Sequence, residues 1–210
     1  PVEMPWINDV KGILEAYLGG QAGGAAVANI LYGVVNPSGK LAETIPVKLA
    51  DNPSYLNFGG GDKVEYREGV FVGYRYYTSR KMETAFPFGH GLSYTTFTQT
   101  LNSLNVDLEN KKVTAEVTVT NTGDVAGKDV VQLYASTPYT DYDKEHLVEK
   151  AAVQLLDYEK TDELAPGEST TVTITADAQD MASWDSTASN EAGTTGNYIL
   201  DAGDYYFTIG

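Results

Sequence analysis

The sequence contains no cysteine and only two histidines, His90 and His146. The absence of cysteine excludes disulfide bonds, zinc ribbons and thiol nucleophiles. Two histidines are too few for a metal site built on several imidazole ligands. We therefore expect no metal ion and no other cofactor. The compartment stays open, because a lack of cysteine is compatible with either side of a membrane.

Basic residues are scarce: 14 Lys and Arg stand against 29 Asp and Glu, for a formal net charge of −15. Such a chain, with no basic cluster, is repelled by phosphate backbones and anionic lipid, so we expect no nucleic-acid or membrane partner. No apolar run approaches the roughly 20 residues that span a bilayer. Residues 1–6 lack the features of a signal peptide. The chain begins abruptly, which indicates a piece of a longer protein, cut by design or by processing.

The composition that remains is globular, with 42% hydrophobic and 20% charged residues over 210 positions. In residues 1–58 the pattern predicts a helix that begins at Asn8 or Asp9 and ends at Gly19-Gly20. Its apolar residues recur with helical spacing: Val10, Ile13, Leu14, Tyr17 and Leu18. A second helix over 25–32 and one short strand over 40–46 follow. A single strand leaves its backbone unpaired, so this α/β fragment is incomplete.

Residues 59–95 predict an ordered connector rather than a flexible linker. They are dense in aromatic side chains, whereas flexible linkers are rich in Gly and Ser. So many rings need a surface to pack against. The rings are Tyr66, Phe71, Tyr74, Tyr76, Tyr77, Phe86, Phe88 and Tyr94.

Residues 96–210 predict an all-β domain. Val113, Ala115, Val117 and Val119 alternate with polar residues, which is the period of a half-buried strand. Further strands are expected near 130–134, 151–156, 170–175 and 205–209, with turns between them. About seven short strands in roughly 110 residues are typical of an immunoglobulin-like sandwich.

Three carboxylates, Asp62, Glu65 and Glu68, surround Tyr66 and Arg67 in the aromatic connector. Glycosidases use a pair of carboxyl groups, and aromatic rings can stack on sugars, so this loop is one candidate site. The alternative is that these are solvated surface charges in a very acidic chain. The run 74–77, Tyr-Arg-Tyr-Tyr, could stack Arg75 between rings or line a sugar subsite. We favour a domain interface for this run, because Tyr and Arg often occupy interfaces.

Other motifs favour structural interpretations. The glycine-rich run 19–24 fits no phosphate-binding fingerprint and is typical of a tight connection. His90 and Ser93 lack an orienting acid, so we expect His90 to fix a turn. Trp184 could stack on a sugar, but we expect it to fill the sandwich core. Residues 137–145 lack the spacing of a calcium loop, and we expect a solvated connection between strands.

Several segments together resemble glycoside hydrolase family 3. They are Pro1 to Trp6, Gly20 to Gly24, Asn36 to Leu41, Tyr66 to Tyr77, Phe86 to Tyr94, Asn121 to Gly123 and Leu164 to Glu168. They occur in the family's order and cover essentially the whole chain. The resemblance implies a partial α/β sandwich over residues 1–58, the connector over 59–95 and a fibronectin type III-like β-sandwich over 96–210.

The same resemblance implies a retaining β-glycosidase, most often a β-glucosidase, as the parent enzyme. The family's nucleophile lies on a TIM-like barrel and its acid/base on an earlier loop of the sandwich domain, and no position here matches either. We therefore expect no catalytic residue in this chain. Its partners would be the missing barrel and the rest of the sandwich domain, and the parent's ligands would be β-linked glucosides or oligosaccharides. By its place in the family, the connector is expected near the active-site rim, with Glu65, Tyr66, Glu68 and Arg75 close to substrate.

Two functions thus compete: a non-catalytic portion of a family 3 enzyme, and an autonomous carbohydrate-binding or adhesive sandwich. The incomplete α/β half favours the first, because a self-contained module would not expose apolar surface there. A third reading, an enzyme that uses the acidic loop alone, is weakest, since nothing orients a base or a nucleophile.

Overall fold

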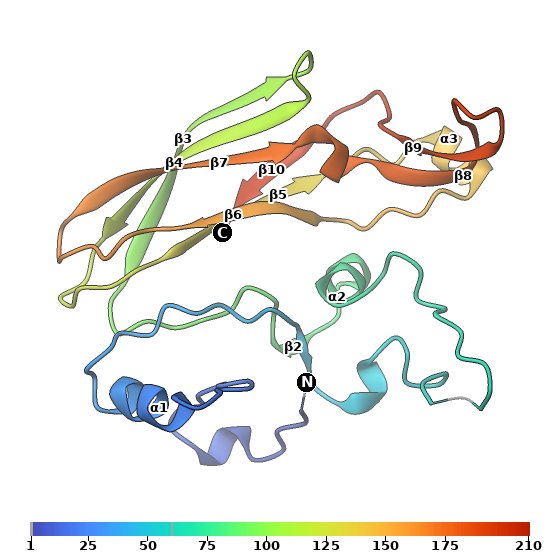
Figure 1. Ribbon diagram of the computed structural model, residues 1–210. Coiled ribbons are helices and arrows are strands. Elements are labelled where there is room, and N and C mark those ends of the chain that lie inside the picture. The colour runs from blue at the N-terminus through green and yellow to red at the C-terminus, as the bar shows by residue number, and fades with distance from the viewer. Residues whose placement is uncertain (1, 60) are drawn as a thin grey trace.

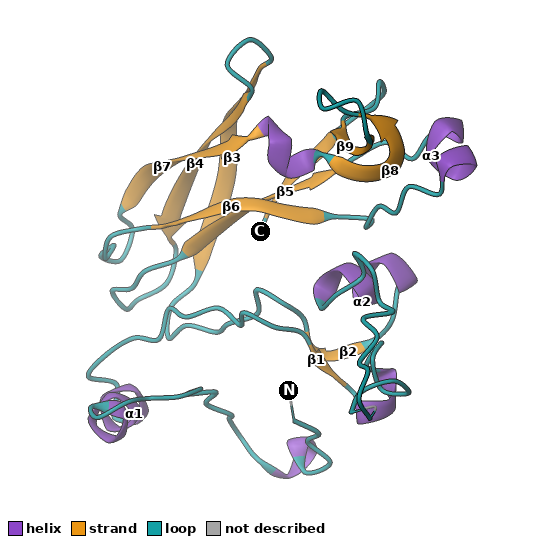
Figure 2. Cartoon of the chain, turned by 45° about the vertical axis from the view of Figure 1, so that its right-hand side comes forward, coloured by secondary structure: helices purple, strands orange, loops and turns teal. Residues whose placement is uncertain are grey.

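The computed structural model describes residues 2–59 and 61–210 of the chain. Two parts follow each other (Figure 1): residues 2–96 lie below a β-sandwich formed by the rest of the chain. The first part is mostly irregular, as the loop colouring of Figure 2 shows. Its regular elements are α1 (Gly23–Leu31), β1 (Ile45–Pro46), α2 (Tyr74–Arg80) and β2 (Thr84–Phe86), with 3-10 turns at Ile7–Asp9 and Leu49–Asp51.

The second part, in the described residues, is built from two three-stranded antiparallel sheets. One sheet has the order β3–β4–β7 and consists of Phe97–Asp107, Lys112–Asn121 and Ser169–Asp177. The other has the order β10–β5–β6 and consists of Tyr206–Ile209, Val130–Ser136 and Gln154–Lys160. A hairpin, β8 (Ser183–Ser189) with β9 (Thr195–Ile199), follows a 3-10 turn at Ala178–Met181. The helix α3 (Asp141–His146) lies between β5 and β6. The predicted α/β-then-β fold class is confirmed.

The hydrophobic core lies between the two sheets. Alternate residues of β4, from Val113 to Val119, are fully buried, as the period of two predicts. Leu133 of β5 packs on them from the opposite sheet, and Ile174 of the neighbouring β7 extends the same cluster. The rest of the chain contributes no comparable cluster, and within residues 2–59 and 61–210 no helix is both long and apolar enough to cross a bilayer.

The expected helix over residues 10–18 is wrong. Only a 3-10 turn at Ile7–Asp9 precedes this segment, and residues 11–18 are all exposed and without regular structure. Helical spacing alone does not stabilise a short helix, because most helical stability comes from packing of the apolar face. Here that face has no surface to pack on. The second helix is confirmed with shifted bounds, as α1.

The expected strand over residues 40–46 is confirmed only for Ile45–Pro46. This β1 pairs with β2 of the connector, so the expectation that it has no partner in this chain is wrong. The expectation that Trp184 fills the sandwich core is also wrong. Trp184 lies on β8, outside the core, and half of its surface is exposed. The core interpretation failed because alternation shows which residues share a face, but not which face is covered.

The two parts of the chain contact each other through several polar groups. Asn36 donates from Nδ2 to the Ala126 carbonyl at 3.0 Å. Within the first part, its Oδ1 accepts from the Tyr94 amide at 2.8 Å, which orients the Asn36 side chain. Lys40 forms an ion pair with Asp129 at 3.3 Å, and both side chains are largely buried. These contacts fix the first part against one end of the sandwich.

Candidate functional site

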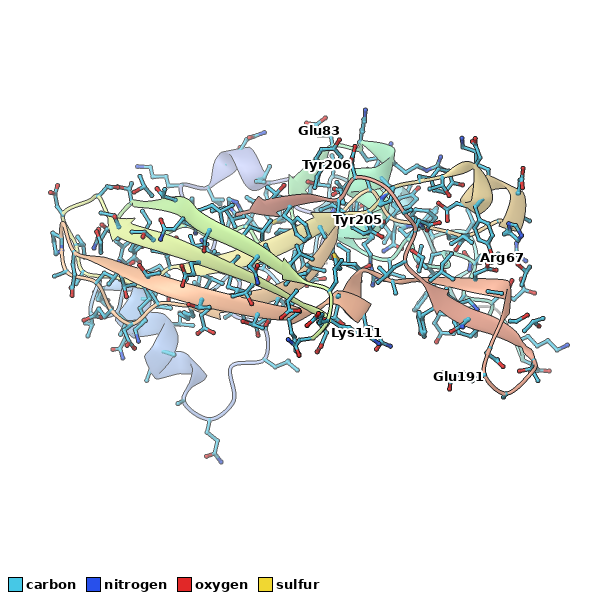
Figure 3. The ribbon with its side chains drawn as sticks, turned by 90° about the horizontal axis from the view of Figure 1, so that it is seen from above. Arg67, Glu83, Lys111, Glu191, Tyr205 and Tyr206 are labelled. Carbon is cyan, nitrogen blue, oxygen red and sulfur yellow. The ribbon has the colours of Figure 1, made fainter. Side chains whose placement is uncertain are left out.

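The candidate segment, residues 62–77, is an exposed loop followed by α2. Glu65 lies on the loop, where its Oε2 accepts a hydrogen bond from Arg67 Nε at 2.6 Å. Both side chains are well exposed, and Figure 3 shows Arg67 at the periphery of the molecule. An exposed pair of this kind contributes little to stability. Tyr66 between them is 85% exposed, so its ring is open to any ligand or neighbouring chain.

Glu68 and Arg75 differ from Glu65 and Tyr66, because both are partly buried. In the described part of the chain, Glu68 Oε2 and Arg75 Nε are buried and have no hydrogen-bond partner. No ion pair joins the two side chains to each other. Buried polar atoms are almost always paired, so each of these atoms calls for a partner that the described residues do not supply.

Helix α2 is fixed to the outer face of the sheet β10–β5–β6. The Tyr74 hydroxyl accepts a hydrogen bond from the Leu155 amide at 2.8 Å. Its ring lies 4.8 Å from Phe88 and edge-on to Tyr134 at 6.2 Å between centroids. Burial, with a smaller effect of Tyr74, raises the pKa of Tyr134 to about 12. These contacts agree with the interface interpretation of residues 74–77. The cation that stacks is Arg80, 5.8 Å above the Tyr76 ring, rather than Arg75.

A second contact holds the loop that precedes α2. Gly69 has φ +56, and a Cβ there would overlap the carboxylate of Glu149 in the sandwich domain. The Val70 amide donates to Glu149 Oε2 at 3.4 Å. The positive φ favours glycine at this position, and the Val70–Glu149 hydrogen bond links the loop to the sandwich.

Beside α2 lies an open cavity of about 560 Å³ between the connector and the sheet. Its lining is mainly aromatic and apolar, and includes Tyr74, Tyr77, Met82, Phe88 and Tyr134. None of its lining residues is Asp, Glu or His, so it offers no pair of carboxyl groups for glycoside hydrolysis. In the part of the chain that the structure describes, no group of three or more acidic or histidine side chains could hold a metal ion.

The remaining sequence candidates are spread over the molecule. Asp62 is exposed on the loop. Ser93 Oγ donates to Asn36 at 2.9 Å, so it does not form a dyad with His90. The His90 amide donates to the Pro87 carbonyl at 3.2 Å, and its carbonyl accepts from the Leu41 amide at 2.8 Å. Its ring lies 5.1 Å from that of Phe86, with the planes tilted by 32°. His90 therefore fixes a turn, although through its backbone rather than its imidazole.

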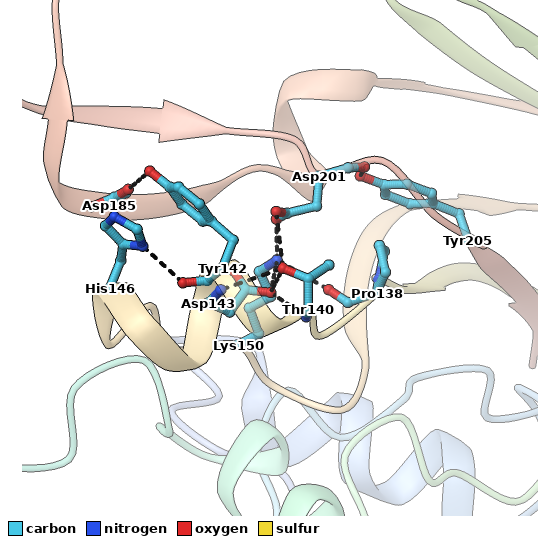
Figure 4. Close-up of polar contacts among 9 residues, drawn as sticks. All are labelled: Pro138, Thr140, Tyr142, Asp143, His146, Lys150, Asp185, Asp201 and Tyr205. Carbon is cyan, nitrogen blue, oxygen red and sulfur yellow. Dashed lines mark hydrogen bonds and ion pairs between the residues drawn. The ribbon is translucent and has the colours of Figure 1, made fainter.

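Sequence reasoning missed a buried ionic cluster at residues 137–145, where α3 replaces the expected solvated connection. Lys150 Nζ contacts the carboxylates of Asp143, at 2.9 Å, and Asp201, and donates to the Pro138 carbonyl at 3.0 Å (Figure 4). Thr140 caps α3, and its amide donates to Asp143 at 2.6 Å. A signal was available: Thr140 followed three residues later by an acid is a capping-box pattern.

Electrostatics in this cluster favour the charged forms. Burial would raise the pKa of Asp143, but the Thr140 amide and the Lys150 ammonium outweigh it and hold the pKa below its usual value. Burial would lower the pKa of Lys150, but its hydrogen bonds to Asp201 and Asp143 outweigh this and raise the pKa. The cluster is an ion network that orders one end of the sandwich, and within it Asp143 Oδ1 is buried with no hydrogen-bond partner among the described residues.

Comparison with known proteins follows the same division of the chain. Residues 1–94 match the family model described as Glycosyl hydrolase family 3 C-terminal domain, and residues 129–210 match that described as Fibronectin type III-like domain. The chain is 49% identical to Thermostable beta-glucosidase B of Acetivibrio thermocellus over 205 residues, which are 95% of this chain and 26% of that protein.

Solved structures agree over the whole chain. The beta-glucosidase of Kluyveromyces marxianus in complex with glucose has a TM-score of 0.86 and 40% identity, and covers 100% of this chain with 24% of its own. Beta-glucosidase 3B of Thermotoga neapolitana has a TM-score of 0.83 and 36% identity, and covers 100% of this chain with 28% of its own. The chain thus spans about a quarter of the length of the relatives it matches.

Proposed function

The chain belongs to glycoside hydrolase family 3, and from this premise we propose that it serves as the non-catalytic C-terminal portion of a retaining β-glycosidase. The activity we infer for the whole enzyme is hydrolysis of terminal β-D-glucosyl residues, because the similar proteins are named as beta-glucosidases. Within that enzyme the chain supports the barrel and the active-site rim. The division at residues 58 and 95 stays a prediction within this proposal.

The observation that carries the proposal is apolar surface left open in the first part of the chain. Leu18 is 101% exposed, Tyr32 86% and Leu56 93%. Exposed apolar residues also adjoin two of them in the chain, Tyr17 beside Leu18 and Leu31 beside Tyr32, and apolar surface of this kind is typical of an interface. Because the chain spans only a quarter of its relatives, the remainder of the enzyme is the natural cover. This surface counts against an autonomous carbohydrate-binding or adhesive module, which would bury it.

The chemistry is assigned to the remainder of the enzyme. Retaining glycosidases need two carboxyl groups about 5–5.5 Å apart on either side of the sugar. In the candidate loop, Glu65 is held by Arg67 on an exposed surface. Glu68 has one buried oxygen without a donor among the described residues. Nothing in this loop sets one carboxyl group as an acid beside a second as a nucleophile.

We infer a supporting role for the loop and α2 at the rim. The sandwich holds α2 through Tyr74 and holds the loop through Glu149, so residues 65–75 are presented in a fixed position. The unpaired atoms of Glu68 and Arg75 are then completed by groups of the remaining enzyme. A rim held by packing in this way positions substrate without taking part in bond cleavage.

The test is reconstitution of the enzyme from two polypeptides. The 210-residue chain and the remaining part of the parent enzyme are produced separately, mixed and passed over a size-exclusion column. Hydrolysis of p-nitrophenyl β-D-glucoside is then measured. We expect no hydrolysis by the chain alone, and hydrolysis by a co-eluting complex. Activity from the lone chain would contradict the proposal.

The rim role is tested in the same complex. Tyr66→Ala and Arg75→Ala are expected to lower kcat/KM by about tenfold while the two polypeptides still co-elute. Tyr158→Ala is the matched control, because Tyr158 is an exposed tyrosine on β6, away from the candidate segment. Unchanged kinetics in both rim variants would remove Glu65, Tyr66, Glu68 and Arg75 from the substrate side of the enzyme.

A further inference from the structure

The β8–β9 hairpin presents two aromatic rings that the sandwich does not cover. Trp184 of β8 and Tyr198 of β9 are direct partners in the strand register, so they share one face of the hairpin. Their ring centroids are 5.1 Å apart, with the planes at 70°. Trp184 is 50% exposed and Tyr198 is 58% exposed. We call this pair the hairpin platform.

The position of the indole in the platform is fixed by a glycine. Gly196 is buried and has φ +104, and a Cβ at this position would lie 2.6 Å from Trp184 Cζ2 and 2.9 Å from Cη2. The indole therefore lies against the β9 backbone on one side and still reaches solvent with half of its surface. This close contact with Gly196 fixes the orientation of the indole, so its other side stays exposed.

The opposite face of the hairpin is anchored to α3. Asp185 is fully buried and accepts hydrogen bonds from the Tyr142 hydroxyl at 2.6 Å and from the Thr187 amide and hydroxyl at 2.7 Å each (Figure 4). The bond from Tyr142 is the main reason that the pKa of Asp185 falls to about 2. A platform held in this way loses little conformational freedom when a ligand binds.

The charge around the platform excludes phosphate-bearing ligands. No Lys or Arg follows Lys160 in the sequence, so the hairpin carries no basic side chain, and Lys144 of the adjoining α3 is paired with Asp141 at 2.7 Å. Nucleic acids also stack on aromatic rings, but their binding depends on cations that track the phosphates. Anionic lipid is repelled for the same reason. A neutral ligand is what remains.

The polar groups of the platform fit a polyol. In the described part of the chain, the indole N–H of Trp184 and the hydroxyl of Tyr198 make no hydrogen bond, so both can bind a ligand. Trp and Tyr combine an apolar ring with a polar group, which suits a ligand with C–H groups on one face and hydroxyl groups at its edge. A pyranose ring has this form.

The hairpin also lies in a different part of the molecule from the open apolar surface of residues 10–35. In Figure 1 the hairpin belongs to the upper layer, whereas the open apolar surface of residues 10–35 belongs to the lower part. In Figure 3 the hairpin, with Glu191 near its tip, projects from one end of the molecule. This placement favours a ligand from solution over the missing part of the same enzyme.

We propose that the Trp184–Tyr198 platform binds neutral β-linked glucan chains at a position separate from the candidate rim. The platform itself is derived from the hairpin alone, and the choice of glucose with β linkages rests on the proposed function. In this arrangement the hairpin holds the enzyme near polymeric material whose free ends are its substrate.

Binding is tested with the full 210-residue chain, without any need for hydrolysis. Electrophoresis in native gels that contain soluble β-glucan (laminarin or hydroxyethyl cellulose) is compared with gels that contain dextran or no polysaccharide. We expect retardation by β-glucan only, about tenfold weaker in Trp184→Ala and reduced in Tyr198→Ala. Tyr158→Ala, an exposed tyrosine on β6, should be retarded like the unchanged chain.

A second measurement keeps the test decisive if Trp184→Ala fails to fold. In Trp6→Phe the only remaining tryptophan is Trp184. Acrylamide quenching of its fluorescence then measures how far a bound ligand shields the platform from solvent. Cello-oligosaccharides should reduce quenching in the chain and in the reconstituted complex alike. No binding of any neutral glucan, retardation by dextran alone, or protection by the remaining enzyme in place of glucan would overturn the proposal. The proposed function has its own outcome: a reconstituted complex without β-glucosidase activity would contradict that function, whatever the result of the glucan-binding test.

Discussion

At the residue scale, Asn121 is the side chain on which one end of the sandwich most depends. It is fully buried, and its Oδ1 accepts from Thr95 Oγ1 at 2.7 Å and from the Gly123 amide at 3.1 Å. Its Nδ2 donates to the carbonyls of Val125 and Leu164, each at 2.8 Å. Asn121→Ala would leave these groups buried without partners, so we expect a loss of about 2–4 kcal/mol in the free energy of unfolding, measured by urea denaturation.

The control for this prediction is Asn102→Ala. Asn102 is exposed on β3 and donates one hydrogen bond to Thr118 Oγ1 at 2.8 Å. Its removal should change the free energy of unfolding by no more than about 0.5 kcal/mol. Equal effects of the two substitutions would mean that burial of the Asn121 network does not determine its contribution.

The ionic pair Asp143–Lys150 makes stability depend on pH in two windows. The pKa of Asp143 is lowered in the folded chain, so its contribution is present above the unfolded value of about 3.9 and is lost as pH falls through the folded value. The pKa of Lys150 is raised, so its contribution is present below about pH 10.4 and is lost as pH rises through the folded value. We therefore expect the free energy of unfolding to fall both at acidic pH and at alkaline pH.

Asp143→Asn tests the acidic window, because Lys150 keeps its contact with Asp201 in this variant. Between pH 5 and pH 2, the midpoint temperature of thermal unfolding should fall less in Asp143→Asn than in the unchanged chain. Asp162→Asn is the control, since Asp162 is exposed and makes no contact in the described part of the chain. Identical acid profiles for all three proteins would show that Asp143 does not contribute to the acid transition.

At the element scale, two hydrogen bonds hold α2 to the sandwich: the Leu155 amide donates to the Tyr74 hydroxyl at 2.8 Å, and the Ala152 amide donates to Ser79 Oγ at 2.9 Å. Tyr74→Phe keeps the ring packing against Phe88 and Tyr134 but removes the acceptor of the Leu155 amide. We expect a loss of about 1–2 kcal/mol and faster hydrogen exchange at Leu155. Tyr76→Phe is the matched control, because the Tyr76 hydroxyl makes no hydrogen bond in the described residues. Unchanged exchange at Leu155 would show that the Tyr74 hydrogen bond does not hold the helix.

The sequence predicts best an element whose own residues carry the pattern. The alternation from Val113 to Val119 predicts β4 without information from the rest of the chain. By contrast, α2 opens with four aromatic or basic residues in a row, which show no helical period, and it begins where Gly73 adopts φ +57 and Tyr74 meets the sheet. The hairpin was missed because nothing in the sequence around Trp184 says which side of β8 the core covers. Tertiary contacts decided both elements.

The candidate site was predictable to a similar degree. Sequence reasoning grouped Glu65, Tyr66, Glu68 and Arg75 by their place among aromatic residues. The structure separates an exposed pair from a partly buried pair, and the unpaired atoms of the second pair are visible only once packing is known. Residue spacing in a loop carries no information on burial, because the loop has no fixed period.

At the scale of the whole molecule, the helix prediction for residues 10–18 is wrong, and we infer that this segment depends on the missing part of the enzyme. Val10 has extended backbone angles, and residues 11–16 make no backbone hydrogen bonds in the described chain. Ile13 and Leu14 are adjacent and both exposed. Adjacent apolar residues in an extended segment are typical of a strand that is buried on both faces in a parallel sheet.

The reconstituted complex therefore tests whether residues 11–16 form a strand against the remaining enzyme. In the isolated chain we expect their amides to exchange with solvent at once, because they have no partner. In the complex the exchange of these amides should slow by several orders of magnitude, while an exposed turn such as residues 108–111 stays fast. A rise in helical circular dichroism with protection spaced at helical intervals would support the helix instead. Absence of protection in an active complex would show that this apolar segment is not part of the interface.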